Sequence, residues 1–111
     1  MTRGNENVSS FNNDTMEIHK KLNSSVFAAG KLVLKPLQEK GLQYVYTDKI
    51  VFHVIHGKLI VTLHKTSYHV TTGDCFYVPA GNVYNIQNLL NEESILVFTQ
   101  LKGTRPVEGG E

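Results

Sequence analysis

Hydrophobic and polar residues alternate in short runs along most of the chain, with turn residues between the runs. The clearest run covers residues 58–64. Leu59, Val61 and Leu63 fall on one side of it, because successive side chains of a β-strand point to opposite faces. No stretch has helical periodicity. The pattern therefore predicts an all-β protein.

Glycine, proline and short polar turns separate the expected strands. These strands cover residues 26–37, 42–46, 50–56, 58–64, 68–70, 75–78, 83–86 and 95–101. Many short strands joined by tight turns are typical of a closed barrel or a two-sheet jelly roll, which leaves few strand edges unpaired. We therefore expect one all-β, jelly-roll β-barrel.

The two ends of the chain differ from this region in composition. Residues 1–24 are rich in Asn, Ser, Thr and charge, and are expected to form a flexible arm because they bury too little apolar surface. Residues 103–111 contain one proline and three glycines and are expected to form a flexible tail. A single domain over residues 25–102 remains, and the 111-residue chain leaves no room for a second.

Composition and charge argue against several classes of partner. The formal net charge is +1 and the basic residues are dispersed, so DNA binding is expected to be weak or indirect. The densest basic group, His19–Lys21, is interpreted as a solvated segment before the first strand, with DNA contact as a lesser alternative. No apolar stretch approaches the ~20 residues that cross a bilayer, so a soluble protein without membrane contact is expected.

Cys75 is the only cysteine, which excludes an intramolecular disulfide and favours a reducing compartment. No basic neighbour or helix N-terminus is expected to activate its thiol. We interpret Cys75 as a small buried apolar residue and not as a nucleophile.

The last expected strand is apolar on both faces across Ile95-Leu96-Val97-Phe98, although a strand with one wet face should alternate. A loop, the N-terminal arm or a second subunit must cover its outer side. Ile60 raises the same question on a strand that otherwise alternates. A symmetric dimer is one hypothesis, with an interface at Ile60, Leu96, Phe98 and Gln100.

The most specific motif runs from Gly73 to Asn88 and reads Gly, five residues, Pro79, one residue, Gly81, two residues, Tyr84. Gly73 begins a turn, and Pro79 and Gly81 reverse the chain between two strands. This spacing resembles the second conserved block of the cupin superfamily, with tyrosine where metal-binding members carry histidine.

In metal-binding cupins the other three ligands come from a first conserved block, which ends at a glycine. This glycine corresponds to Gly57, so the three ligand positions can be counted back from it. The acidic position, with six residues between it and Gly57, falls on Ile50, and the two histidine positions fall on Tyr44 and Tyr46. With Tyr84, all four positions hold non-ligands, since a phenol stays protonated near neutral pH. We therefore expect no metal, no cofactor and no enzymatic activity.

None of the five histidines occupies a ligand position, and His53 and His56 are spaced to point to opposite faces of a strand. His53 remains a candidate to line an interior pocket with Tyr84. The alternative function is therefore a metal-free cupin that binds a sugar or another small molecule between Tyr44, Tyr46, Tyr84 and His53. Filling of the interior by side chains is favoured over such a pocket.

A narrower resemblance rests on Gly81 to Asn88 (Gly-Asn-X-Tyr-Asn-Ile-X-Asn), Asn91-Glu-Glu93 and Phe98-Thr-Gln100. Together these segments resemble the C-terminal cupin domain of the centromere protein C family, over about residues 26–102. The resemblance implies a homodimerisation domain of an inner-kinetochore scaffold, located in the nucleus at the centromere. Its implied partners are a second copy, kinetochore proteins and, in some members, the factor that deposits the centromeric histone.

Overall fold

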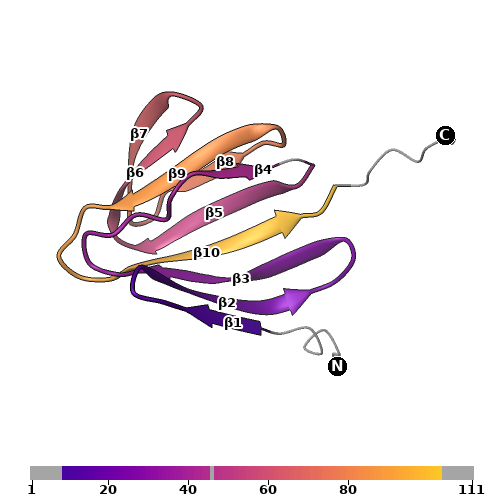
Figure 1. Ribbon diagram of the computed structural model, residues 1–111, viewed down its shortest axis with the longest axis horizontal. Coiled ribbons are helices and arrows are strands. Elements are labelled where there is room, and N and C mark those ends of the chain that lie inside the picture. The colour runs from indigo at the N-terminus through magenta and orange to yellow at the C-terminus, as the bar shows by residue number, and fades with distance from the viewer. Residues whose placement is uncertain (1–8, 46, 104–111) are drawn as a thin grey trace, which may run out of the picture.

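Two antiparallel β-sheets surround one hydrophobic core in the computed structural model, which describes residues 9–45 and 47–103 (Figure 1). The larger sheet has the strand order β1-β2-β3-β10-β5-β8, and the smaller sheet has the order β4-β9-β6-β7. The strands are β1 (Ser9–Asn12), β2 (Met16–Asn23), β3 (Phe27–Leu34), β4 (Gln43–Val45), β5 (Lys49–His56), β6 (Lys58–Leu63), β7 (Thr66–Thr71), β8 (Cys75–Val78), β9 (Asn82–Asn88) and β10 (Ser94–Leu101). Within these residues, no helix is long and apolar enough to cross a membrane.

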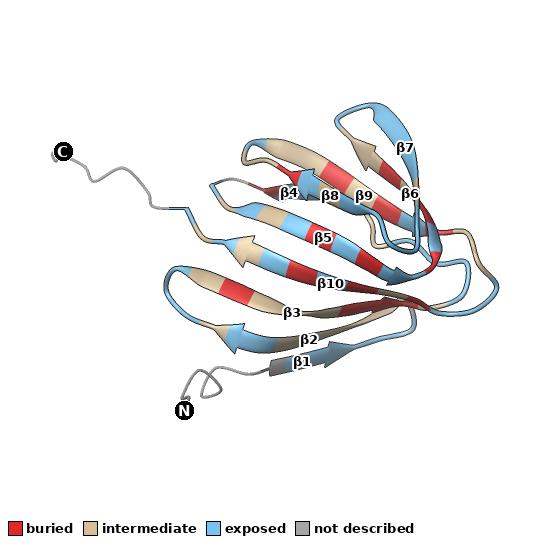
Figure 2. Cartoon of the chain, turned by 180° about the vertical axis from the view of Figure 1, so that it is seen from behind, coloured by how far each residue is buried: buried red, intermediate tan, exposed pale blue. Residues whose placement is uncertain are grey.

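Strands β3 to β10 match the expected segments to within a few residues, which confirms the all-β fold. The alternation of apolar and polar residues along these strands explains most of the pattern of buried and exposed side chains. Leu59 and Val61 of β6 are buried, as are Phe52 and Val54 of β5, while His53 between the latter pair faces solvent. Figure 2 shows this alternation of buried and exposed positions along β5 and β10. One apolar face per strand is therefore directed into the space between the sheets.

The predicted flexible arm is corrected over residues 9–23, which form strands β1 and β2. Strand β2 pairs with β3, and Met16 and Ile18 pack against the core from this second strand of the large sheet. His19–Lys21 therefore belong to a strand rather than to a mobile DNA-binding segment. Residues 1–8 and 104–111 of the predicted arm and tail lie outside the described residues.

The core joins the two sheets through aliphatic and aromatic side chains. Leu32 and Leu96 from the large sheet and Leu59 and Ile86 from the small sheet are each at most 1% exposed. Phe52 stacks on Phe76 with 4.9 Å between ring centroids. Full burial of such a side chain contributes roughly 1.5–3 kcal/mol, so this core is the main source of stability.

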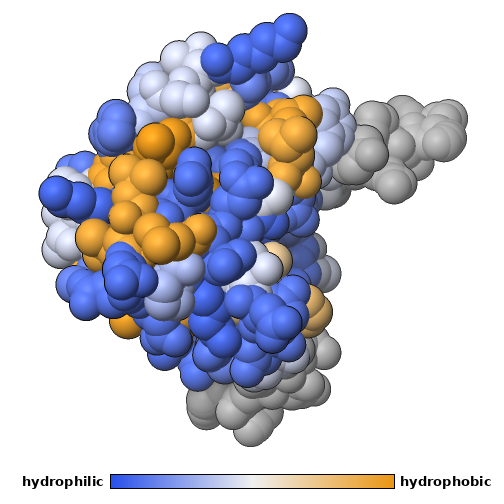
Figure 3. All heavy atoms as spheres, turned by 60° about the vertical axis from the view of Figure 1, so that its left-hand side comes forward, coloured by the Kyte–Doolittle hydropathy of each residue, from blue (hydrophilic) through white to orange (hydrophobic). Residues whose placement is uncertain are grey.

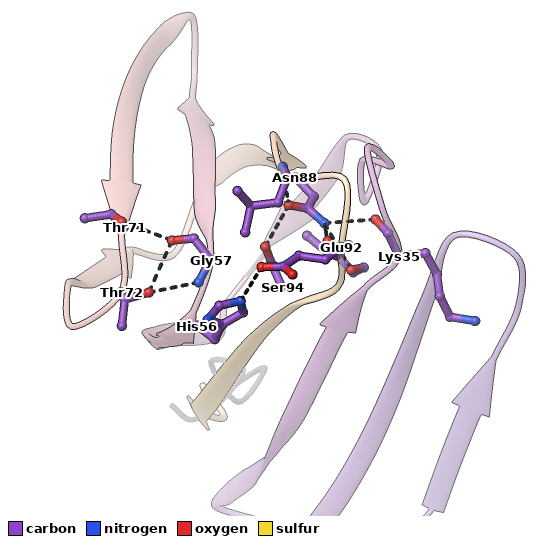
Figure 4. A network of polar contacts seen from close by, with 10 residues as sticks. Lys35, His56, Gly57, Thr71, Thr72, Asn88, Glu92 and Ser94 are labelled. Carbon is purple, nitrogen blue, oxygen red and sulfur yellow. Dashed lines mark hydrogen bonds and ion pairs between the residues drawn. The ribbon is translucent and has the colours of Figure 1, made fainter.

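One end of the barrel is closed by the side chain of Asn88, the last residue of β9 (Figure 4). The amide is 1% exposed, and its Nδ2 donates to the backbone carbonyls of Leu34, Lys35 and Glu92 at 3.2, 3.0 and 2.8 Å. Its Oδ1 accepts from the backbone N–H of Leu90 at 2.9 Å and from Ser94 Oγ at 2.7 Å. This one side chain therefore links the end of β3, the β9–β10 loop and the start of β10.

Gly57, between β5 and β6, packs directly against this network. Its φ of 152° lies in the region that favours glycine, and an added Cβ would lie 2.3 Å from Ser94 Oγ. Its N–H donates to Thr72 Oγ1 at 3.0 Å, and its carbonyl accepts from Thr71 Oγ1 at 3.1 Å (Figure 4). The backbone conformation of Gly57 and the close approach of Ser94 therefore both require glycine at this position.

We predict that Asn88→Ala lowers the free energy of unfolding by about 3 kcal/mol, because it leaves a buried hydroxyl and several backbone groups without partners. Asn91→Ala is the matched control, since Asn91 is exposed in the same loop region. Urea denaturation of both variants checks this expectation. Equal stabilities for the two variants would show that the network contributes little.

Candidate functional site

A cavity of about 830 Å³ lies between the sheets, although filling by side chains was expected from the sequence. It is found at the end of the barrel away from Asn88, where β10 finishes and β5 begins. Leu32, Val45, Phe52 and Phe98 are the buried apolar part of its wall. The remaining lining residues are Ile18, Lys20, Lys40, Gln43, Tyr44, Thr47, Asp48, Ile50, Tyr84 and Gln100. The volume is within the range of ~300–1,000 Å³ that is usual for small-molecule sites.

Three of the four positions that the sequence resemblance assigned to metal ligands line this cavity. Tyr84 and Ile50 contribute to its wall, and Tyr44, which is 46% exposed, also lines it. Tyr46 lies outside the described residues. Within the described ranges, no three His, Cys, Asp or Glu side chains are grouped closely enough to hold a metal ion. The motif spacing thus locates the interior of the barrel, but the side chains there are not a metal-binding set.

Two other candidate residues point away from the cavity. His53 was a candidate for the pocket wall, but it is exposed on β5, opposite Cys75 of β8 and Val97 of β10. The correction follows from the alternation of β5, because Phe52 and Val54 occupy the inner face. Cys75 is likewise exposed and not buried as expected.

Tyr84 is the most deeply buried polar side chain of the cavity wall. Its residue is 3% exposed, and its ring lies 5.9 Å from that of Phe52. Burial raises the pKa of its phenol to about 12. The hydroxyl forms no hydrogen bond with the residues that the structure describes, so within them it is a buried donor without a partner.

Lys40 lies beside Tyr84, in the loop before β4. Its Nζ is 5.6 Å from the centre of the Tyr84 ring and donates a hydrogen bond to Gln43 Oε1. Burial lowers the pKa of this ammonium group. None of the described carboxylates forms an ion pair with it. Sequence patterns did not single out Lys40 as a cavity residue, because it falls between the two motifs.

The one acidic lining residue, Asp48, already has partners. Its carboxylate accepts from Gln100 Nε2 at 2.5 Å and from the backbone N–H of Gly103 at 3.0 Å. The Gly103 hydrogen bond is the main cause of a lowered pKa at Asp48. Both of these partners are neutral, so Asp48 keeps its charge, but Lys20 and Lys40 also line the cavity and make the net charge of its wall positive.

The proposed interface residues on β10 also require correction. Leu96 is fully buried and Phe98 is 8% exposed, and Gln100 lines the cavity, so all three belong to the inner face of the strand. Since β10 lies between β3 and β5, its inner residues pack into the core. Ile60 lies on the other sheet and is partly exposed, beside Gln87 and His69.

The opposite face of β10 carries exposed apolar side chains. Val97 is 37% exposed, and it is accompanied by neighbours on β5, β8 and β10 that are at least 40% exposed. We call this set the outer apolar face: Val51, Ile55, Tyr77, Val97 and Leu101. The N-terminal strands do not cover it, because β2 continues the sheet edge to edge beside β3.

Exposed apolar side chains also occur near the Asn88 end. Leu37, in the loop after β3, is 59% exposed and has a positive φ of 59°. Figure 3 turns this side of the molecule forward and shows hydrophobic patches separated by hydrophilic residues. The alternation of residues in the sequence did not predict which apolar side chains would be exposed. Alternation reveals the period of a strand, but not which of its faces packs against the core.

The two facing sheets and the cavity between them form a cupin-type barrel. The cupin domain of Cnp3 from Schizosaccharomyces pombe has the same fold, with a TM-score of 0.79 and 24% sequence identity over 87% of this chain and 70% of that one. The family profile described as Mif2/CENP-C like matches residues 16–100. The chain therefore belongs to the Mif2/CENP-C family.

Curated relatives agree with this assignment. Centromere protein C of Ovis aries is 57% identical over 89 residues, which are 80% of this chain and 22% of the sheep protein. The inner kinetochore subunit MIF2 of Saccharomyces cerevisiae is 34% identical over 90 residues, or 80% of this chain and 16% of the yeast protein. The chain thus spans less than a quarter of the length of either relative.

The buried phenol of Tyr84 predicts a loss of stability in alkali. In the unfolded chain a tyrosine loses its proton near pH 10, whereas the folded protein holds the Tyr84 proton to about pH 12. Unfolding therefore releases a proton above pH 10, so this contribution is complete below pH 10 and is lost as the pH rises through 12.

We expect the unfolding free energy of the unmodified protein to fall by ~2 kcal/mol relative to Tyr84→Phe between pH 10 and 12. Urea denaturation of both proteins at several pH values measures the difference, and the groups that the two proteins share cancel. Parallel pH profiles would contradict the burial of this phenol.

Proposed function

We propose that this chain is a non-enzymatic homodimerisation and protein-interaction module of an inner-kinetochore scaffold at the centromere in the nucleus. Membership of the Mif2/CENP-C family supports this proposal, as do the names of relatives such as the inner kinetochore subunit MIF2 of yeast. The short share of each relative that the chain spans fits one module of a longer scaffold.

A non-enzymatic role is supported by the chemistry of the barrel interior. Tyr84 and Ile50 stand at two of the positions where metal-binding cupins hold ligands. A protonated phenol and an alkyl group bind divalent metals poorly. Lys40 and Asp48 both line the cavity, but Asp48 is engaged by Gln100 and Gly103 and is a poor general base there.

The outer apolar face is the observation that favours self-association. Val97 lies on the central strand β10, beside Lys31 of β3 and His53 of β5. A twofold axis near Val97 would bring the same face of two subunits together and remove its apolar side chains from water. A standard interface of this kind buries about 1,600 Å² in total.

Such a dimer would act by multivalency. Joining two copies of a scaffold raises the effective concentration of every binding segment that the second copy carries, without a new contact in the module itself. In this proposal the module supports the organisation of centromeric nucleosomes and kinetochore assembly by doubling the binding segments of the scaffold.

We predict that the unmodified chain is a dimer of twice 12.4 kDa at micromolar concentration, and that Val97→Glu weakens dimerisation at least tenfold. The physical reason is that each dimer would bury two carboxylates near its twofold axis without partners. Sedimentation equilibrium of both proteins measures the dissociation constants.

Two control variants locate the interface. Leu42→Glu changes a residue that is 76% exposed outside the outer apolar face, and it should leave the dimer intact. Ile60→Glu tests the outer side of the small sheet, where the sequence also raised the question of an interface. Monomeric unmodified protein would refute the dimer, and dissociation by Ile60→Glu alone would transfer the interface to the small sheet.

A further inference from the structure

The interior cavity has no role in the proposed dimer, but its wall has the properties of a ligand site. It combines a buried aromatic and aliphatic surface with two donor groups: a hydroxyl without a hydrogen bond to the described residues, and an ammonium group without a carboxylate partner among them. The ring of Phe52 lies 5.9 Å from Tyr84 and 6.3 Å from Phe98, so three rings surround part of the space. Leu32, also in the wall, is 1% exposed and extends this apolar surface.

The first donor is the hydroxyl of Tyr84. A hydroxyl removed from water without a hydrogen bond costs about 1–3 kcal/mol, and most buried polar groups avoid this cost. Tyr84 lines the cavity and is only 3% exposed, and none of the described residues forms a hydrogen bond with its hydroxyl. A ligand atom that accepts a hydrogen bond would satisfy this group.

The second donor is the ammonium group of Lys40, which lies next to Tyr84 and is paired within the described ranges with the neutral amide of Gln43. A partly buried cation without a counter-ion favours an anion at the same place. Lys20 also lines the cavity and adds a second positive charge. Asp48, the one acidic residue of the wall, offsets only one of these two charges, so the wall keeps a net positive charge.

We propose that the cavity binds a small organic acid, with its carboxylate held by Lys40 and Tyr84 and its apolar ring or branched chain packed against Phe52 and Phe98. A carboxylate accepts several charge-assisted hydrogen bonds, so it can satisfy both donors at once. This site is independent of the proposed dimer, because Phe98 faces inward and Val97 faces outward on the same strand.

Other ligand classes fit the wall less well. A sugar needs polar partners for several hydroxyl groups, whereas Leu32, Phe52 and Phe98 present hydrocarbon. A cationic ligand could use the aromatic rings, but the Lys40 ammonium already lies over the ring of Tyr84 and would repel it. The unpartnered donors and the positive charge together favour an anion with an apolar body.

The test uses phenylacetate as the probe and phenylacetamide as its uncharged match, titrated into the isotope-labelled protein and followed by the backbone amide NMR signals. Phenylacetate should give saturable shifts at millimolar concentration, centred on residues 43–45, 50–52 and 98–100. Phenylacetamide should bind at least tenfold more weakly, because it cannot neutralise Lys40. Absence of saturable shifts, or equal affinity for the two probes, would overturn the proposal.

Variants then assign the two donors. Tyr84→Phe and Lys40→Met should each weaken phenylacetate binding at least fivefold, while the control Lys65→Met, in the exposed turn after β6, should bind as the unmodified protein does. Tyr84→Phe should be at least as stable as the unmodified protein at neutral pH, because it removes a buried hydroxyl that has no hydrogen bond to the described residues. Unchanged affinity in both cavity variants would refute the assignment of the donors.

One more titration tests the cavity proposal separately from the proposed dimer. Val97→Glu should bind phenylacetate with the same affinity as the unmodified protein, whatever its oligomeric state. Loss of the dimer with binding intact would leave the cavity proposal standing, and a dimer that binds no acid would overturn the cavity proposal alone.

Discussion

The buried amide of Asn88 holds together the end of the barrel on which the rest of the fold depends. A strand sandwich can slide or open where its connecting loops meet, because loop carbonyls have no ladder partners of their own. Here one side chain supplies partners to Leu34, Lys35 and Glu92, while Ser94 and Leu90 complete its acceptor side. With that end closed, the inner residues of β3, β9 and β10 keep a fixed register, and the cavity beside Tyr84 lies at the other end.

The end of the barrel at Asn88 and the end at Tyr84 therefore differ in how their interiors are built. Near Asn88 the polar groups are satisfied by one another and the interior is filled. Around Tyr84 the aromatic rings keep a space open. The Tyr84 hydroxyl and the Lys40 ammonium group face this space, and the described residues provide neither an acceptor for the hydroxyl nor a carboxylate for the ammonium group. A core that was optimised for stability alone would fill such a space, since voids forfeit dispersion contacts. The end at Tyr84 thus carries a constraint that stability does not explain.

The sequence predicted strands β3 to β10 because alternating residues such as Leu59 and Val61 report the period of a strand directly. The resemblance to the second cupin block also singled out Tyr84 as a possible pocket residue, and Tyr84 lines the cavity. The sequence pattern failed at β2, whose order comes from pairing with β3 and packing of Met16 and Ile18 on a distant core. It also assigned the wrong face of β10, because Leu96 and Val97 are both apolar and only the neighbouring strands decide which faces inward.

The position of β10 in the large sheet has a consequence for how the chain is made. Strand β10 is the last of the described strands along the chain, yet it lies between β3 and β5, and Phe98 pairs with both Gly30 and Phe52. During synthesis, β3 and β5 must wait for their shared neighbour while the rest of the domain is translated. Folding is then governed by contacts between residues far apart in the chain, which form slowly. Until β10 emerges from the ribosome, the inner edges of β3 and β5 remain available for pairing with other chains.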